Sequence, residues 1–110
     1  METPDDIDLR LRGNDLHLRL LDGDVTASTE IAEIFLPIVV GKLQKWNPNL
    51  HDPHLTDMAA DDALISYLQR PSQYSPTHLP LDKYLIMSAR GDLLHLLRKQ
   101  QHPGFPKNIQ

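Results

Sequence analysis

The stretch that decides the fold is residues 57–99, DMAADDALISYLQRPSQYSPTHLPLDKYLIMSARGDLLHLLRK. Its first part, Asp57 to Gln69, is rich in acids and spaces its apolar residues by three and four, which indicates an amphipathic helix. Arg70–Pro71 ends this helix, because the residue before a proline avoids helical backbone angles. A turn at Tyr74–Ser75–Pro76 follows. A second helix then begins near Pro80 and becomes more basic toward its C-terminal end.

The remainder of the chain has the same helical spacing and almost no strand signals. We expect helices over residues 14–21 (preceded by a helical stretch at 6–12), 25–46, 53–69 and 81–101. Pro37 should bend or break the second helix near residues 33–36. The residues expected to face the core are Leu16, Leu20 and Leu21; Ile31, Ile34, Phe35, Ile38, Val39 and Leu43; Leu55, Met58, Ala59, Ala63, Ile65 and Leu68; and Leu81, Leu85, Ile86, Ala89, Leu93, Leu96 and Leu97. The sequence thus predicts an all-α protein, a compact bundle of about four helices.

Length and composition are those of one globular domain. The chain has 110 residues, of which 40% are hydrophobic, so it can bury a core without covalent cross-links. We expect an N-terminal arm at 1–13, the helical domain at 14–102 and a linker or tail at 103–110. The absence of cysteine excludes disulfides and thiolate metal sites. The longest apolar run, residues 34–40, is far shorter than a membrane span, and the acidic N-terminus is unlike a signal peptide. We therefore expect a cytoplasmic protein that does not enter a membrane.

Charge is distributed unevenly along the chain. Residues 82–107 contain five basic and two acidic residues, a balance of +3, whereas the remainder contains six basic and thirteen acidic residues, a balance of −7. A protein with two partners of opposite charge would show such asymmetry, although a chance clustering of solvated charges would give the same pattern.

Motifs for catalysis and for metal binding are missing. The chain has no Gly-rich phosphate loop, no Gly-x-Ser-x-Gly and no His-Glu-x-x-His, so we expect neither an enzyme nor a bound cofactor. The best candidates for a metal site are His51, His54, Asp57 and Asp61. Histidine and aspartate at the start of a helix more often serve as caps and dipole partners than as ligands, and we expect no metal.

The order of these parts resembles region 2, the core domain, of bacterial RNA polymerase sigma factors of the extracytoplasmic-function type. Members carry an acidic helix, a turn with an aromatic residue and a proline, and a helix with the pattern aromatic-Leu-x-x-x-Ala-Arg that ends in Leu-Arg. In this chain the pattern falls on Tyr84–Leu85, Ala89–Arg90 and Leu97–Arg98. The resemblance covers about residues 16–101 and implies a fold like that of sigma region 2.

The resemblance implies that the acidic helix docks on the clamp helices of the polymerase β′ subunit. The expected polymerase-binding residues are Asp57, Ala60, Asp61, Asp62 and Tyr67. Asp57 and Asp61 match acids of the family motif, whereas Ala60 replaces a glutamine common in members. The three aspartates also repel one another and have no basic residue four positions away, so a basic partner would relieve that repulsion.

The resemblance further implies that the last helix holds unpaired non-template bases of the promoter −10 element. Such binding needs cations for the phosphates and aromatic surfaces for the bases. The expected DNA-binding residues are Lys83, Tyr84, Arg90, Gly91, Arg98 and Lys99. Tyr84 could equally be a core residue, and Gly91 replaces an asparagine common in the family. Candidates for stacking on bases are Tyr74, Tyr84 and Trp46.

The expected function is therefore that of a sigma-factor core domain in transcription initiation. Its partners would be core RNA polymerase, the non-template strand of promoter DNA and an anti-sigma protein. The alternative is a small helical protein-interaction module with the same fold that does not bind DNA. Ala60 and Gly91 favour the alternative, and the basic C-terminal part favours the first interpretation.

Overall fold

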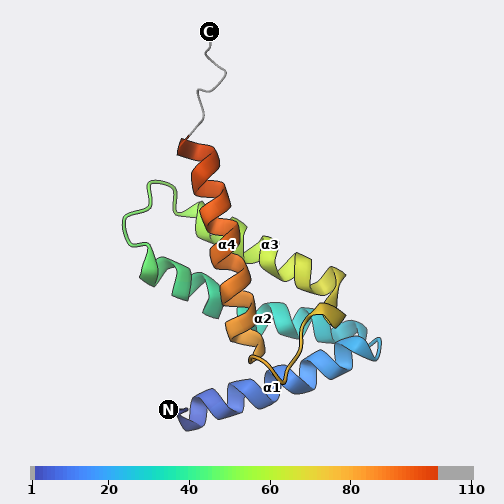
Figure 1. Ribbon diagram of the computed structural model, residues 1–110. Coiled ribbons are helices and arrows are strands. Elements are labelled where there is room, and N and C mark those ends of the chain that lie inside the picture. Colours follow the sequence, from blue (N-terminus) through green and yellow to red (C-terminus); the bar gives the residue numbers. More distant parts are fainter. Residues whose placement is uncertain (1, 102–110) are drawn as a thin grey trace.

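A computed structural model describes residues 2–101, and every regular element in this range is helical (Figure 1). The predicted all-α bundle is confirmed. The predicted tail at 103–110, which includes Lys107, lies outside the described residues. The elements are α1 (Pro4–Leu21), α2 (Val25–Trp46), α3 (His54–Gln69), the 3-10 turn η1 (Pro71–Gln73) and α4 (Leu81–Gln101).

Local hydrogen bonds explain where α1 and α2 begin. The Thr3 hydroxyl accepts from the Asp6 N–H, and the Asp6 carboxylate accepts from the Thr3 N–H, so this capping box extends α1 through residues that the sequence indicated as a separate stretch. Gly23 follows α1 with a φ of 89°, which suits glycine. The Asp24 side chain then caps α2 by accepting from the Thr26 N–H.

Arg19 stabilises the turn between α1 and α2. The Arg19 guanidinium donates to the carboxylates of Asp24 and Glu30, each at 2.8 Å. Hydrogen bonds from Thr26 and from Arg19 lower the pKa of Asp24 to about 2. The cap of α2 and the C-terminal end of α1 are therefore tied together by one charged network.

The sequence predicted a bend or a break in α2 at Pro37, and the break is wrong, because the helix runs unbroken from Val25 to Trp46. Proline removes the hydrogen bond to the carbonyl of Glu33. Pro37 and Glu33 are both exposed, so water can satisfy that carbonyl and the helix tolerates the loss.

Helix α4 crosses the bundle and packs on both α2 and α3, while α1 lies across the start of α4 (Figure 1). Gly13 permits that close approach, because a Cβ at this position would lie 3.1 Å from the Leu81 Cβ and 3.3 Å from the Phe35 Cζ. Most of the predicted core is buried, but Leu21 is exposed, and the residues that are only half-buried are Leu20, Ile34, Ile38, Leu68, Leu96 and Leu97. The buried core is Leu16, Ile31, Phe35, Val39, Leu43, Leu55, Ala59, Ala60, Ala63, Leu64, Tyr67, Tyr74, Leu81, Leu85, Ile86, Ala89 and Leu93.

The predicted inner face of α3 is wrong in part. Met58 and Ile65 were expected in the core but are 47% and 50% exposed. The buried face consists of Leu55, Thr56, Ala59, Ala60, Ala63, Leu64 and Tyr67. Because several of these side chains are small, α4 can lie close to the α3 backbone, and the larger Met58 and Ile65 are turned to the surface.

Aromatic rings join α1, α3 and the segment before α4. The Nδ1 atom of His17 lies 2.6 Å from the Tyr67 hydroxyl, and the Tyr74 hydroxyl donates to the Leu79 carbonyl at 2.6 Å. The Tyr84 ring lies 4.8 Å from the Tyr74 ring, centroid to centroid. Burial lowers the pKa of His17 and raises that of Tyr74 to about 12. This cluster fixes the segment that positions the start of α4.

Candidate functional site on α3 and α4

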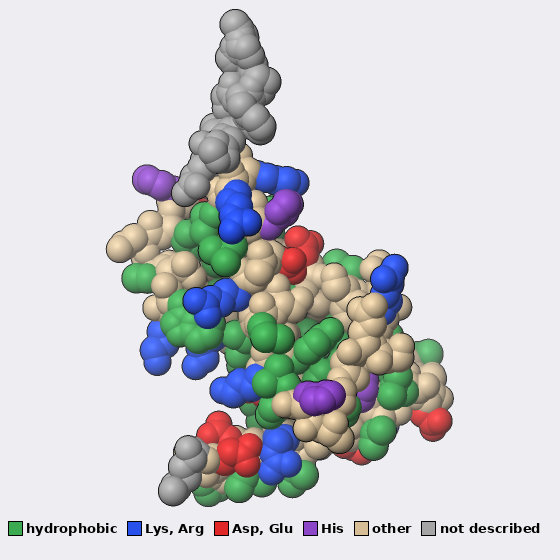
Figure 2. Space-filling model, viewed as in Figure 1, with side chains coloured by type: hydrophobic (Ala, Val, Ile, Leu, Met, Phe, Trp, Pro, Cys, Tyr) green, Lys and Arg blue, Asp and Glu red, His purple; other side chains and the backbone are tan. Residues whose placement is uncertain are grey.

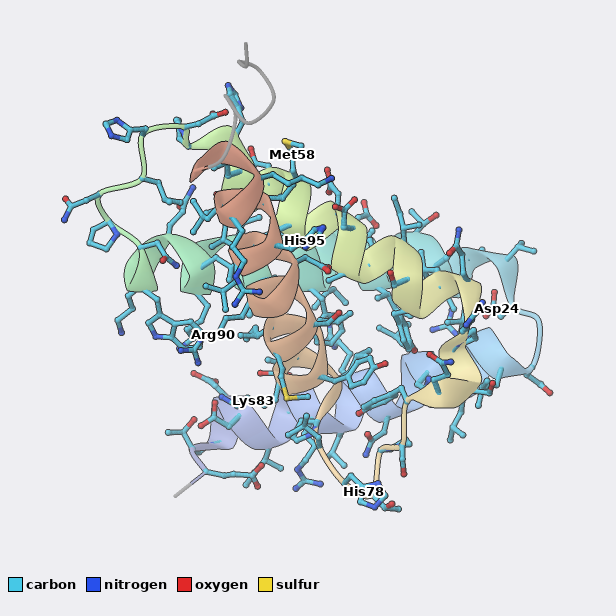
Figure 3. The ribbon with its side chains drawn as sticks, turned by 45° about the horizontal axis from the view of Figure 1, so that its top comes forward. Asp24, Met58, His78, Lys83, Arg90 and His95 are labelled. Atoms are coloured by element: carbon cyan, nitrogen blue, oxygen red, sulfur yellow. The ribbon has the colours of Figure 1, made fainter. Side chains whose placement is uncertain are left out.

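The outer side of α3 is acidic with two apolar side chains between the acids. Asp57, Asp61 and Asp62 are all exposed, as sequence reasoning expected. Met58 and Ile65 are seven residues apart in the sequence, so they lie on the same side of the helix. Figure 3 shows Met58 projecting from the bundle. We call these five residues the acidic face of α3.

Nothing within the described chain neutralises this face. Among residues 2–101, no ion pair shorter than 4 Å involves Asp57, Asp61 or Asp62. The helix dipole accounts for Asp57, which lies in the first turn, but not for the other two acids. The face therefore has the composition of a docking surface for a partner that is both basic and apolar.

Ala60 and Tyr67, the other two residues of the predicted polymerase contact, do not lie on this surface. They are 1% and 2% exposed and belong to the core. Tyr67 packs with His17 and Tyr84. Because both side chains are buried, they can affect a partner's binding to this surface only through the packing of α3 against α4.

A row of basic and apolar side chains runs along the outside of α4. Lys83, Met87, Arg90, Leu94 and Arg98 follow one another at spacings of three and four and are all exposed; we call them the basic stripe. Figure 3 shows Lys83 and Arg90 on the same side of α4, and Figure 2 shows basic side chains interspersed with hydrophobic ones on this face. Lys99 is exposed in the neighbouring row.

Gly91 is exposed beside the basic stripe, and no packing accounts for it. A Cβ at this position would meet no atom within 4 Å. A glycine within a helix usually has a packing or contact reason, and within the described residues no packing reason is present. The predicted role of Gly91 in DNA binding stays a prediction.

Two of the three aromatic side chains expected to stack on bases are held elsewhere. Tyr74 is buried in the aromatic cluster, and Tyr84 is half-buried against it. Trp46, at the C-terminal end of α2, is 48% exposed. The Lys42 Nζ lies 5.8 Å and the Arg90 Cζ 5.3 Å from the centroid of its ring. Trp46 thus joins the end of α2 to the basic stripe, a contact that no spacing in the sequence indicates.

Acidic side chains lie on two parts of α4 outside the basic stripe. Asp92 is half-buried, and burial, together with the nearby Asp62 carboxylate, raises its pKa. At the N-terminal end of α4, a surface depression of about 340 Å³ is lined by Glu2, Asp6, Pro80, Asp82 and Lys83. The acids of this depression offset part of the charge of Lys83.

Two further features bear on the function classes. Within residues 2–101, no three His, Asp or Glu side chains are arranged to hold a metal ion, and this includes the candidates His51, His54, Asp57 and Asp61. None of the helices in the described part is long and apolar enough to cross a membrane.

Comparisons with protein-family models, with curated proteins and with solved structures find no match to this chain. The resemblance to sigma region 2 therefore depends on the sequence pattern alone, which falls on Tyr84–Leu85, Ala89–Arg90 and Leu97–Arg98.

Proposed function

We propose that this chain is a sigma-factor core domain that binds RNA polymerase through the acidic face of α3 and single-stranded promoter DNA through the basic stripe of α4. The observation that carries the proposal is the placement of two exposed faces of opposite charge on adjacent, mutually packed helices. A factor that connects a basic protein surface to a DNA strand needs both faces to be accessible at once.

The composition of the acidic face supports the first contact. Met58 and Ile65 supply apolar area at the centre, and Asp57, Asp61 and Asp62 supply charge around it. Stable interfaces commonly combine apolar anchors with charges that set orientation and rate of association. The clamp helices of the β′ subunit, which the resemblance names as partner, would have to offer arginine or lysine beside an apolar groove.

The composition of the basic stripe supports the second contact. Three cations on one side of a single helix can follow a phosphate backbone, and Met87 and Leu94 between them offer apolar surface to bases. The half-buried Tyr84 ring lies at the same end of α4 as Lys83. A strand that is already unpaired should bind better than a duplex, because no unstacking energy is required.

A pull-down with core RNA polymerase tests the α3 contact. The variant D57K/D61K should lose binding, since both positions would repel a basic surface, and its helicity should be unchanged because both side chains are exposed. The matched control D8K/D22K makes the same change in net charge at exposed positions of α1 and its C-cap and should bind as the wild type does. Equal binding of D57K/D61K and the control would refute this docking surface.

A salt titration with a labelled single-stranded −10 oligonucleotide tests the α4 contact. Each lost phosphate contact should flatten the dependence of log K on log salt by about 0.7. R90A/R98A should therefore have a shallower slope than the wild type, whereas R12A/R70A, which removes two exposed arginines elsewhere, should not. Polymerase binding without DNA binding in any condition would favour the alternative, a protein-interaction module.

A further inference from the structure

Trp46 is the most exposed of the tryptophan, tyrosine and phenylalanine side chains among the described residues. The aromatic side chains of the core are buried and Tyr84 is half-buried, whereas almost half of Trp46 is open to solvent. Its ring is held between α2 and α4 by Lys42 and Arg90. Cation contacts of this kind orient an indole ring without covering it as a hydrophobic core would.

The surroundings of Trp46 are basic. Lys42, Lys45 and Arg90 lie near it or next to it in the chain, and no ion pair within residues 2–101 involves any of the three. A partner that covers this surface must bring negative charge to the cations and a flat apolar group to the ring. Single-stranded DNA supplies both, because each nucleotide pairs a phosphate with a planar base.

We propose that Trp46 is a stacking platform for one unpaired base of the strand bound along α4, with the Lys42 and Arg90 side chains contacting the phosphates on either side of that base. The inference rests on the proposed function and extends the DNA site from α4 onto the end of α2. In the free protein Arg90 lies over the indole. When DNA binds, the Arg90 guanidinium leaves the indole ring and contacts a phosphate. The base then stacks on the part of the ring that Arg90 has left.

Trp46 is the only tryptophan of the chain, so its intrinsic fluorescence reports on this site alone. The experiment titrates the whole chain with a single-stranded DNA of −10 sequence. Anisotropy of an end label measures binding, and tryptophan emission measures stacking. We expect the emission to be quenched with the same midpoint as the anisotropy change. The duplex of the same sequence should cause no quenching at concentrations where the single strand saturates.

Three variants separate stacking from charge. W46A should weaken single-strand binding about tenfold, within the range that base–aromatic stacking gives, and should leave the salt slope unchanged. W46F keeps a smaller ring and should lose less affinity. L18A removes an exposed apolar side chain without a ring from α1, outside both proposed binding faces, and should bind as the wild type does. Thermal unfolding of each variant shows that the fold is retained.

The outcomes distinguish this inference from the proposed function. Anisotropy that reports binding without any quenching, together with wild-type affinity of W46A, would overturn the platform and leave DNA binding on α4 intact. Equal quenching by duplex DNA would also overturn it, because no unpaired base would be required. If no DNA binds in either assay, both the platform and the proposed DNA contact fail.

Discussion

The two glycines at positions 13 and 91 offer a test of the packing, because alanine at each should have opposite effects on stability. Both lie within helices, where alanine is preferred over glycine by about 1 kcal/mol. At Gly91 a Cβ would meet no atom within 4 Å, so G91A should raise the free energy of unfolding by roughly 0.5–1 kcal/mol. Gly41 is equally open, and G41A should have the same effect.

At Gly13 the added methyl group would lie 3.1 Å from the Leu81 Cβ and 3.3 Å from the Phe35 Cζ. The Leu81 Cβ is attached directly to the backbone at the start of α4 and the Phe35 ring is fully buried, so neither can move without shifting a helix. Overpacking of this kind costs about 1–3 kcal/mol. Because the helix-propensity gain is common to both variants, G13A should be less stable than G91A by about 1–3 kcal/mol.

Urea unfolding followed by far-UV circular dichroism measures this difference, provided that the m-values of the variants agree. Equal stabilisation by G13A and G91A would refute the close approach of α1 to α4. Destabilisation by G91A would show that Gly91 has a packing role that the structure does not contain.

Two further predictions concern the core and the buried histidine. L85A should lower the free energy of unfolding by roughly 2–5 kcal/mol, since Leu85 is buried between the packed helices; a change within the error of urea unfolding would contradict its place in the core. Stability should fall as the pH decreases below about 6.5, the ordinary pKa of histidine, because burial lowers the pKa of His17 and only the unfolded state gains its proton. Above that pH His17 is neutral in both states, so it does not make the free energy of unfolding depend on pH. H17Q, compared with the wild type by urea unfolding from pH 7.5 to pH 5, should have a flatter profile; identical profiles would exclude His17 as the cause.

Apart from the start of α1, which lies at Pro4 and not at residue 14, the helix boundaries could be predicted because they depend on local chemistry. Pro71 ends α3 after Arg70, Gly23 follows α1, and Asp24 caps α2 through its own side chain. These signals act over a few residues and do not require knowledge of the partner helix. The exposure of Asp57, Asp61 and Asp62 was predictable for a similar reason, since isolated carboxylates are rarely buried.

The inner face of α3 could not be predicted from hydrophobicity alone. Met58 and Ile65 are more apolar than Ala60, yet Ala60 is buried and they are exposed. What decides this is how closely α4 approaches, and that distance depends on all the side chains between the two helices. Two apolar residues of the candidate docking surface were therefore missed, and the buried Ala60 and Tyr67 were placed on it.

The contact between Trp46 and Arg90 was also beyond sequence reasoning. The two residues belong to different helices that are distant in the sequence, and neither has a spacing that indicates the other. The single tryptophan was a candidate for stacking because of its residue type. Only the crossing of α2 by α4 shows that its ring adjoins the basic stripe (Figure 1).

The most direct test of the account measures binding of the single-stranded −10 oligonucleotide by anisotropy, with and without core RNA polymerase, for the wild type, D57K/D61K and R90A/R98A. For the wild type, core polymerase should raise the affinity for DNA, because both faces are used at once. D57K/D61K should keep the weak binding of the isolated chain and lose this gain, whereas R90A/R98A should still bind polymerase and fail to hold the DNA. If core polymerase leaves the wild-type affinity unchanged, or if both variants behave as the wild type does, the assignment of two separate binding faces is wrong.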